Sequence, residues 1–345
     1  MKYYDVAVVG ALGMVGTEIL NILEQRNFPI KNLRALDRKD LEGTPIKFKD
    51  KIYYTGTADA ENFEGVDIAL FTVGPQAAEK LVPLAVEKGA IVIDNSRHFR
   101  LDPEVPLVCP EANPYDLDWH KGIIANPNCT TLVCIPVFKP IYDLSRIVRI
   151  IASTYQSASG AARIGMLEVK KQSLEVATGI PVTPPTCFQY QLGFNLIPFI
   201  DVFEEKGYTR EEWKLVNETH KILGDPNIRI VGTSVRVPVL ISHSVSVNIE
   251  TESKLTLDEV RKALEEAPGV TVIDDIENLK FPQPIEAAGK DDIYVGRIRE
   301  DFSTENGICL FLTGDNIRKG AALNAIQIAE VLDEKGMVEE WKSKR

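Results

Sequence analysis

The sequence lacks the features of a membrane or secreted protein. No apolar run approaches the roughly 18 residues that a membrane-spanning helix needs, and Met1 leads almost directly into sequence typical of a folded domain, so we expect no transmembrane or targeting segment. The five cysteines are an odd number without any Cys-x-x-Cys spacing, which argues against a disulfide framework or a zinc site and fits a reducing cytoplasm: Cys109, Cys129, Cys134, Cys187 and Cys309.

An excess of positive charge is also absent. The formal net charge of -11 argues against a nucleic-acid surface or a polybasic membrane anchor, although a local cluster of Arg and Lys can still bind an anionic ligand. Hydrophobic content of 44% and charged content of 26% are ordinary for a globular protein. A chain of 345 residues exceeds the roughly 250–300 beyond which one core tends to split, so we expect two domains.

A glycine-rich turn near the N-terminus predicts a dinucleotide site. The apolar run Val6–Val9 is typical of a buried strand, and Gly10-Ala11-Leu12-Gly13-Met14-Val15-Gly16 follows it, before an amphipathic helix expected from about Thr17 to Arg26. In this context glycines let the backbone approach a pyrophosphate at the helix N-terminus. The spacing is Gly-x-x-Gly-x-x-Gly, not the commoner Gly-x-Gly-x-x-Gly, and the three glycines alone are equally compatible with a plain tight turn.

The end of the second expected strand bears on which nucleotide binds. Leu33–Leu36 leads into Asp37, about 20 residues after the glycine turn, where an acidic side chain can hold both hydroxyls of an adenosine ribose and repel a 2′-phosphate. Arg38 follows immediately and could attract that phosphate. The alternative interpretation is a solvated pair of charges at a strand end.

Strands and helices continue to alternate in the first part of the chain. Strands are expected at Ile68–Thr72 and Ala90–Asp94, joined by a helix around Ala77–Glu87, with Gly74-Pro75 as a turn on the cofactor side. The pattern predicts an α/β fold with a mostly parallel, doubly wound sheet, whose ligands collect beyond the carboxyl ends of the strands. The residues expected at the rim of that crevice are Gly74, Asn95, Ser96 and Arg100.

A cysteine lies at a predicted helix start in the middle of the chain. Asn126-Pro127-Asn128 suits a tight turn, and Cys129-Thr130-Thr131 leads into the apolar run Leu132–Ile135, which indicates a helix N-terminus close to Cys129. An ordinary thiol is only slightly ionised at neutral pH, and a helix N-terminus favours the reactive thiolate. Taken alone, an isolated cysteine such as Cys129 is more often a half-buried structural residue than a nucleophile.

The pattern changes after this cysteine to one typical of an α+β domain with mostly antiparallel strands and helices on one face. Strands are expected at Ser145–Ser153, Ser244–Glu250, Tyr294–Arg299 and Ile308–Thr313, and helices at Glu211–Leu223 and Leu257–Ala267. The segment Gly179–Pro198 is rich in proline and predicts a long loop over a partner or a site. An Ala-rich helix, Lys319–Leu332, is expected to pack back onto the first domain.

Several short motifs follow one another along nearly the whole chain. They are Gly10–Gly16, Asp94-Asn95-Ser96 with Phe99-Arg100, Asn126–Thr131, Gln156 with Ser159-Gly160-Ala161, Glu211-Glu212-Trp213-Lys214, Arg236-Val237-Pro238, His243-Ser244, and Asp315-Asn316 with Lys319-Gly320-Ala321-Ala322. Each is weak singly, but in this order the chain resembles the phosphorylating aspartate-semialdehyde dehydrogenase family. The resemblance implies a Rossmann-type domain of residues 1–127, completed by a C-terminal helix at 319–345, and a catalytic and dimerisation domain at 128–318.

The resemblance also implies a role for each matching position. Cys129 is implied as the nucleophile, His243 as the general acid/base and Gln156 as the group that orients the acyl intermediate. Arg236 and Glu211 are implied as the partners of the substrate carboxylate and ammonium groups, and Arg100 with Lys214 as phosphate ligands. The implied cofactor-binding positions are Gly10, Leu12, Gly13, Met14, Val15, Asp37, Arg38, Gly74, Ser159, Gly160 and Asn316, and no metal is expected.

The implied reaction is the reversible, NADP-dependent conversion of L-4-aspartyl phosphate to L-aspartate 4-semialdehyde and phosphate, through a thioacyl group on Cys129. It would serve the biosynthesis of lysine, threonine, methionine and isoleucine in a cytoplasmic homodimer or tetramer with no nucleic-acid or membrane partner. The family's usual Gly-Ala-Thr-Gly turn reads Gly10-Ala11-Leu12-Gly13 here. Asp37 weakens the case for NADP while Arg38 and Lys39 partly restore it, so the hypothesis is NADP with reduced discrimination against NAD.

Other interpretations stay open from the residues alone. N-acetyl-γ-glutamyl phosphate reductases act on a longer, acetylated substrate, whose uncharged nitrogen would leave Glu211 without a partner. Glyceraldehyde phosphate dehydrogenases share a Cys-Thr-Thr run, but Leu132 follows it here. A non-catalytic dinucleotide sensor is a further possibility. Singly, the pair of Glu211 with Lys214 is typical of a solvated helix face, Arg236 of a strand edge and His243 of a surface or core histidine.

Overall fold

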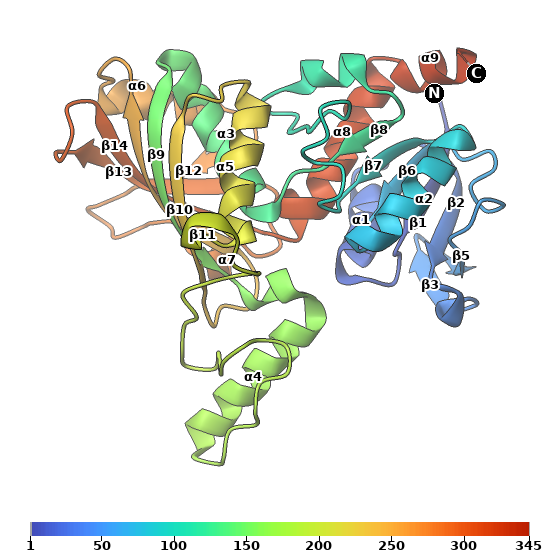
Figure 1. The fold of residues 1–345 in the computed structure, drawn as a ribbon, viewed down its shortest axis with the longest axis horizontal. Helices are drawn as coiled ribbons and strands as arrows, with labels where there is room; N and C mark the ends of the chain where they lie inside the picture. The colour runs from blue at the N-terminus through green and yellow to red at the C-terminus, as the bar shows by residue number, and fades with distance from the viewer. Residues whose placement is uncertain (1, 345) are drawn as a thin grey trace. The chain divides into compact units, whose positions relative to one another are not determined.

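The computed structural model describes residues 2–344, and the chain divides into two compact units. Unit 1 combines Met1–Asn128 with Ala321–Arg345, and unit 2 is the continuous segment Cys129–Gly320. In Figure 1 unit 1 therefore carries both the blue and the red ends of the colour scale, whereas unit 2 runs from green to orange.

Unit 1 is built on a six-stranded sheet in the order β5-β2-β1-β6-β7-β8, in which every pairing is parallel. Its strands are β1 (Tyr4–Val9), β2 (Ile30–Asp37), β5 (Gly56–Thr57), β6 (Ile68–Phe71), β7 (Ile91–Asp94) and β8 (Ile123–Ala125). A small antiparallel hairpin, β3 (Pro45–Phe48) and β4 (Lys51–Tyr54), and the short 3-10 turns Lys39–Leu41 and Pro114–Trp119 complete it. The expected parallel, doubly wound sheet is confirmed.

Helices cover both faces of this sheet, which is why its central strands are apolar at consecutive positions. Alternate strand residues such as Val6 and Val8 share one core cluster with Ile19 of α1 (Met14–Gln25) and Ile326 of α8 (Leu323–Glu334). The intervening residues, Ala7 and Val9 among them, are equally buried, and α2 (Pro75–Glu87) packs against β6 and β7.

Two sequence-based expectations about helix starts in unit 1 need correction. Helix α1 begins at Met14, not near Thr17, because Gly13 is its N-cap and the glycine turn passes straight into the helix. Gly74-Pro75 is not a separate turn, because Gly74 is the N-cap of α2 and Pro75 its first residue, a position where the missing N–H of proline costs nothing.

The C-terminal segment is not one continuous helix. A π-helical turn at Arg318–Ala322 precedes α8, and α9 (Met337–Ser343) follows Gly336, whose φ of 69° interrupts the helix. The expected packing of this segment is confirmed, since Leu323, Ile326 and Leu332 of α8 lie in the core of unit 1.

Unit 2 contains a mixed, mostly antiparallel sheet in the order β10-β9-β11-β14-β13-β12, with parallel pairing only between β10 and β9 and between β12 and β13. Its strands are β9 (Ile147–Gln156), β10 (Arg229–Arg236), β11 (His243–Thr251), β12 (Val270–Val272), β13 (Ile293–Asp301) and β14 (Gly307–Gly314). Its helices are α3 (Cys129–Leu144), α4 (Ala162–Thr178), α5 (Arg210–Leu223), α6 (Leu257–Glu266) and α7 (Pro284–Ala287), with 3-10 turns at Ala158–Ala161 and Glu205–Gly207.

One face of this sheet carries the main helices, as the sequence predicts. Helices α3, α5 and α6 contact its strands, and Val133, Phe138, Leu215 and Val260 share a buried cluster with the inward side chains of the strands (Figure 1). The sheet therefore supports α3 and α5, whose N-terminal parts carry residues discussed below.

Helix α4 was not predicted from the sequence. Figure 1 shows it extending away from the sheet of unit 2, followed by an irregular segment that runs back along it. The carboxylates of Glu168 and Glu175 on α4 accept hydrogen bonds from Thr183, Thr186 and the backbone of Cys187 in that segment. The expected irregular course of Gly179–Pro198 is confirmed.

Within residues 2–344, no helix is both long and apolar enough to cross a lipid bilayer.

Candidate active site

Cys129 is the first residue of α3, as the turn residues before it predict. Its Sγ lies 3.3 Å from Nε2 of His243, which is the first residue of β11. The aligned N–H groups of a helix N-terminus favour a negative charge at this place. A thiolate at Cys129 is thus stabilised by its backbone surroundings and contacts an imidazole directly.

His243 is completely buried, and its second ring nitrogen is engaged by Ser157. Nδ1 lies 3.1 Å from the backbone nitrogen of Ser157, which donates to it, and 3.1 Å from Oγ of the same residue. Burial and the nearby charge of Arg236 lower the pKa of His243 to about 3, against weaker opposing effects of Glu211 and the Ser242 backbone. The imidazole is therefore neutral at physiological pH.

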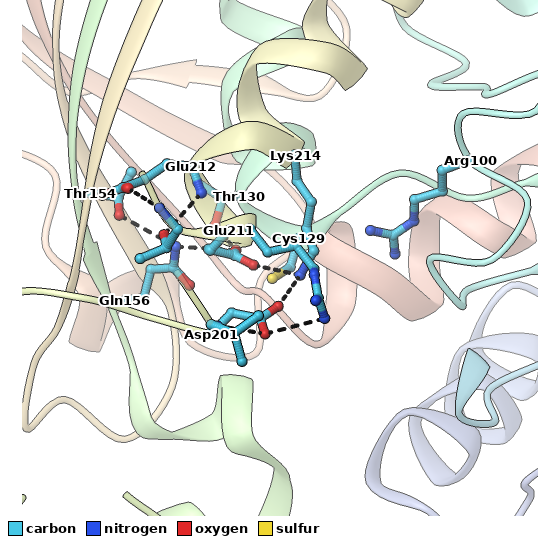
Figure 2. Close-up of polar contacts among 12 residues, drawn as sticks. Arg100, Cys129, Thr130, Thr154, Gln156, Asp201, Glu211, Glu212 and Lys214 are labelled. Carbon is cyan, nitrogen blue, oxygen red and sulfur yellow. Dashed lines mark hydrogen bonds and ion pairs between the residues drawn. The ribbon is translucent and has the colours of Figure 1, made fainter. Parts of the chain in front are cut away.

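The N-terminal turn of α5 carries a charged cluster that is drawn in Figure 2. Nζ of Lys214 lies 2.9 Å from Oε2 of Glu211 and 3.1 Å from Oδ2 of Asp201. Burial alone would raise the pKa of Glu211, but attraction and a hydrogen bond from Lys214, together with Arg236, lower it to about 2. Burial lowers the pKa of Lys214, but attraction and hydrogen bonds from Glu211 and Asp201 outweigh burial, so the pKa is raised. Both side chains are ionised throughout the physiological range.

A capping box fixes the start of this helix. The Thr209 hydroxyl accepts the N–H of Glu212, and the Glu212 carboxylate accepts the N–H of Thr209 and that of Ser234 on β10. Glu212 thus ties the first turn of α5 to the sheet, with Glu211 next to it in the sequence. The Thr-x-x-Glu spacing that signals such a cap is readable in the sequence, although its consequence for Glu211 is not.

Gln156 and Arg236 end two paired strands, β9 and β10, and lie opposite each other in the register. Nε2 of Gln156 is 3.3 Å from Oε1 of Glu211, which also accepts from the Thr130 hydroxyl at 3.4 Å (Figure 2). Nη1 of Arg236 donates to the backbone oxygen of Ser157 at 2.8 Å. Because parallel strands end at one edge of a sheet, the amide and the guanidinium reach the same place as Cys129 and His243.

Three further predicted positions, Ser159, Gly160 and Asn316, lie beside this group. Ser159 donates its hydroxyl hydrogen to Oδ1 of Asn316 at 2.9 Å, and the same oxygen accepts the backbone N–H of Ser242. Gly160 contacts the guanidinium of Arg236, and a Cβ atom there would lie 2.6 Å from Nη1. Unit 2 therefore brings together Cys129, His243, Gln156, Arg236, Glu211, Lys214, Ser159, Gly160 and Asn316.

The predicted nucleotide residues of unit 1 form a second group at the carboxyl ends of β1 and β2. Gly10 has a φ of 83°, a conformation that favours glycine, and a Cβ there would lie 2.7 Å from the Thr72 hydroxyl. The N–H of Leu12 donates to Oδ2 of Asp37, and Oδ1 accepts the N–H of Arg38. Arg38 forms an exposed ion pair with Asp40. Gly13 caps α1 without any side-chain hydrogen bond, and Met14 and Val15 begin that helix.

Arg100 is buried in unit 1 and holds two backbone segments together. Its Nη2 donates to the carbonyl of Asn95 at 2.8 Å, and its Nε to the carbonyl of Asn126 at 2.9 Å. Asp94 closes the turn by accepting the N–H and hydroxyl hydrogens of Ser96. Part of the Arg100 fork thus shapes the loop before Cys129, a structural role that the sequence does not indicate.

Comparison with known proteins assigns the chain to a family. Residues 5–120 match the model of the semialdehyde dehydrogenase NAD binding domain, and residues 138–319 match that of the semialdehyde dehydrogenase dimerisation domain. Aspartate-semialdehyde dehydrogenase of Aquifex aeolicus (strain VF5) is 46% identical over 97% of this chain and 99% of its own length, and that of Bacillus subtilis (strain 168) is 43% identical over 96% and 98%.

The chain belongs to the aspartate-semialdehyde dehydrogenase family. A solved structure agrees: aspartate semialdehyde dehydrogenase II of Vibrio cholerae complexed with ASA has a TM-score of 0.94 and 41% identity, covering 97% of this chain and 99% of its own. The family resemblance seen in the sequence is confirmed, and the N-acetyl-γ-glutamyl phosphate reductase and non-catalytic sensor alternatives are not favoured.

Sequence reasoning missed some residues that surround the family's motifs in this structure. Asp201, which shares Lys214 with Glu211, lies in an irregular segment with a φ of 68° and has no sequence signal. Ser157 belongs to none of the motifs quoted above, although it contacts His243 through both its backbone and its hydroxyl. Within residues 2–344, no cluster of three or more His, Cys, Asp or Glu side chains could hold a metal ion.

Proposed function

We propose that this chain catalyses the reversible conversion of L-4-aspartyl phosphate to L-aspartate 4-semialdehyde and inorganic phosphate. The observation that carries the proposal is the 3.3 Å contact between Cys129 Sγ and His243 Nε2 at the start of α3. It occurs in a chain that is 46% identical to an aspartate-semialdehyde dehydrogenase along nearly its whole length. The reaction supplies a precursor of lysine, threonine, methionine and isoleucine.

Cys129 acts as the nucleophile in this proposal. Its thiolate attacks the acyl carbon of the acyl phosphate, the bond from that carbon to the phosphate oxygen breaks, and a thioester remains on Sγ. The contact with His243 and the N-terminus of α3 stabilise the thiolate and the oxyanion that develops during attack. Gln156, at the end of β9, orients the acyl group from the side of Glu211.

Charge complementarity selects the amino-acid part of the substrate. The remaining N–H groups of Arg236 present a planar fork for the α-carboxylate, since Nη1 already donates to Ser157. Glu211 stays ionised because its pKa is about 2, so it can pair with the α-ammonium group. An acetylated nitrogen would carry no charge for Glu211 to balance.

Lys214 is proposed to bind the phosphate that leaves or enters, together with Arg100. Its ammonium group forms ion pairs with two carboxylates, those of Glu211 and Asp201, which orient it. An ammonium has three N–H donors, so two such partners do not use all of them. An ammonium held in this way can accept an anion while its partners retain their hydrogen bonds.

Unit 1 is proposed as the dinucleotide-binding unit and unit 2 as the catalytic and dimerisation unit. The first N–H groups of α1 have no side-chain cap, and Gly10 brings the turn close to β6, which suits a pyrophosphate at this helix end. A nicotinamide cofactor, when bound, supplies the hydride that reduces the thioester. We propose NADP with reduced discrimination against NAD, because Asp37 and Arg38 favour opposite cofactors; a strong kcat/KM preference for NAD would refute it.

The second unit is proposed to form a homodimer, directly or within a tetramer. The matching family model describes a dimerisation domain. Exposed apolar side chains are concentrated on α4 and the segment after it: Ile164, Leu167, Leu174, Ile180, Tyr190, Phe194, Leu196, Val202 and Phe203. So much apolar surface on one arm is typical of a protein contact. Light scattering of the purified protein tests this, and a monomer at micromolar concentration would contradict it.

A single experiment tests the proposed reaction. The purified chain is mixed with L-4-aspartyl phosphate without any reductant, and its intact mass is measured. The expected result is one added aspartyl group that maps to Cys129 and disappears when NADPH is added, with release of the aldehyde. Absence of an adduct together with absence of NADPH oxidation would overturn the proposal.

A further inference from the structure

Arg236 is a buried cation whose guanidinium has few protein partners. Its Nη1 donates to the backbone oxygen of Ser157, and in the described part of the chain it forms no ion pair with a carboxylate. Burial lowers the pKa of Arg236, against opposing effects of Glu211, Cys129 and Cys187. A guanidinium nevertheless stays protonated in proteins. A charge buried in this way needs compensation from some other group.

The aromatic ring of Phe188 lies against this guanidinium. Cζ of Arg236 is 5.7 Å from the centre of the ring, within the roughly 6 Å over which a ring face attracts a cation. Phe188 is only 9% exposed, so water hardly competes for the contact. A carboxylate would occupy N–H groups of the guanidinium, whereas a ring face attracts the charge and leaves those N–H groups for a ligand.

Helix α4 holds Phe188 in place. The segment that carries the ring runs back along this helix (Figure 1), and the N–H groups of Cys187 and Phe188 donate to the Glu168 carboxylate at 2.7 and 3.3 Å. The ring packs in a buried cluster with Val169 of α4. A Cβ at Gly165 would lie 2.9 Å from Cζ of Phe188, so the absence of a side chain there makes room for the ring.

The same segment also fixes the backbone of Arg236. Ile197 and Arg236 exchange two backbone hydrogen bonds, of 2.9 and 2.8 Å, at the end of β10. Phe188, Ile197 and Arg236 all line one small cavity of about 90 Å³. The irregular segment therefore contacts Arg236 at both its backbone and its charged end.

Two contacts of different kinds restrict the guanidinium. The hydrogen bond from Nη1 to Ser157 sets the direction of one N–H group but leaves the plane of the guanidinium free to turn about that direction. The Phe188 ring opposes this turning, because it occupies the space over Cζ. A carboxylate accepts two parallel N–H groups in one plane, so a plane that is fixed beforehand reduces the ordering that binding requires.

We propose that Phe188 is a positioning residue for the substrate carboxylate: its ring compensates the buried charge of Arg236 and fixes the guanidinium plane for a bidentate contact. The inference rests on the proposed function, in which Arg236 binds the α-carboxylate. Phe188 has no part in the chemical step, so it acts on the amino-acid substrate and not on phosphate or hydride transfer.

Phe188→Leu tests this role in the full-length enzyme, because leucine keeps an apolar side chain and removes the ring face. Kinetics are measured in the oxidative direction with aspartate semialdehyde, phosphate and NADP, each varied while the other two are saturating. We expect KM for aspartate semialdehyde to rise about 10-fold, while kcat and KM for phosphate stay within about 2-fold of the wild type.

Phe281→Leu is the matched control. Cζ of Arg297 lies 5.3 Å from the centre of the Phe281 ring, which is the same kind of contact, but Arg297 is exposed and is not one of the site residues. This variant should leave all three constants unchanged. If KM for aspartate semialdehyde is the same in Phe188→Leu as in Phe281→Leu, the positioning role is refuted.

Dependence on Arg236 separates this role from a general effect on packing. Arg236→Met removes the cation, so adding Phe188→Leu to it should change kcat/KM for aspartate semialdehyde less than about 2-fold, against about 10-fold when Arg236 is present. Equal effects in the two backgrounds would show that Phe188 acts through the core alone, and would overturn the inference.

The contact can also be tested without activity, by NMR of the protein with isotope-labelled arginine. Hydrogens over the face of an aromatic ring are displaced upfield, and the spectrum of Arg236→Met identifies which signals belong to Arg236. We expect displaced N–H signals of Arg236 in the wild type and their return to the usual range in Phe188→Leu. If Phe188→Leu does not fold, the wild-type spectrum decides, and undisplaced signals there would overturn the inference.

Failure of this inference is distinguishable from failure of the proposed function. A wild-type chain with displaced Arg236 signals that does not turn over aspartate semialdehyde would refute the proposed function and leave the contact between ring and guanidinium standing. An active chain in which Phe188→Leu has the wild-type KM would refute the role of Phe188 alone.

Discussion

The backbone of Gly160 lies against the guanidinium of Arg236, so closely that a Cβ atom at position 160 would be 2.6 Å from Nη1. Gly160 was predicted from the sequence as a cofactor-binding residue, but this contact gives it a second role. Without a side chain at 160, Arg236 can lie over the edge of the turn and donate to Ser157.

We expect Gly160→Ala to displace the Arg236 fork and to raise KM for the amino-acid substrate about 10-fold, the cost of one misaligned charge-assisted hydrogen bond. Steady-state kinetics at saturating cofactor measure this. Gly232→Ala on β10 is the matched control, because its Cβ would meet Leu215, Ala152 and Glu212 at ordinary contact distances of 3.4 to 3.9 Å. Equal KM values for the two variants would contradict the role of Gly160.

Cys129→Ser should lower turnover by several orders of magnitude, because an alcohol is far less ionised than a thiol at neutral pH. Cofactor binding, measured by fluorescence titration of NADPH, should stay within about 2-fold of the wild type, since the proposed dinucleotide unit is untouched. Turnover near that of the wild type would refute covalent catalysis at this residue.

Lys214→Ala is expected to change the pH dependence of activity. In the native protein the folded pKa of Glu211, about 2, lies below its ordinary 4.5, so its stabilising contribution is complete above pH 4.5 and is lost as the pH falls towards 2. Without Lys214, burial is no longer opposed by the largest lowering effects, so the pKa of Glu211 should rise above its native value. The variant should therefore lose kcat/KM as the pH is lowered from about 8 to 5, where the native enzyme keeps it.

The same variant should also raise KM for phosphate in the oxidative direction. Lys262→Ala on α6 is a suitable control, because its ion pair with Glu266 is exposed and distant in sequence from the site. A pH profile of Lys214→Ala that superimposes on that of the control would show that Glu211 does not depend on Lys214.

Thr209→Ala and Thr256→Ala remove equivalent caps from α5 and α6, where each threonine accepts the N–H of a glutamate three residues later. Each should lower the free energy of unfolding by about 1 kcal/mol, measured by denaturant titration. Only Thr209→Ala should also raise KM for the amino-acid substrate, because Glu211 and Lys214 lie near the start of α5. Identical kinetics of the two variants would argue that the start of α5 does not position these residues.

Asp37→Asn is expected to shift cofactor preference towards NADP. The amide oxygen can still accept the N–H of Leu12, whereas the negative charge that repels a 2′-phosphate is removed. We expect the ratio of kcat/KM for NADP to that for NAD to rise about 10-fold. A ratio that does not change would mean that Asp37 serves the turn alone.

The sequence predicts those parts of the fold in which local pattern and burial agree. The apolar runs at Val6–Val9 and Ile91–Asp94 are buried strands, and the turn residues before Cys129 precede a helix. In each of these segments the local preference of the residues agrees with the position of the segment in the fold. The family motifs likewise follow one another along the chain. Nine of the site positions predicted from them meet in unit 2.

What the sequence could not predict depends on contacts that are distant in the chain. Helix α4 has apolar residues such as Ile164, Leu167 and Leu174 that remain exposed, so its pattern does not indicate a core-facing helix. Asp201 reaches Lys214 only through the course of an irregular segment, and the N–H of Ser157 reaches His243 only because β9 and β11 are paired. A backbone donor has no signature in a sequence of side chains.

The two units also differ in when their chains become complete. Unit 2 is one uninterrupted segment, whereas the core of unit 1 needs Leu323, Ile326 and Leu332 from the far end of the chain. During synthesis on the ribosome, which proceeds from the N-terminus, we expect unit 2 to fold first while the parallel sheet waits for α8. Strands made earliest would thus be the last to acquire their cover, so their apolar side chains would stay exposed to solvent until the end of translation.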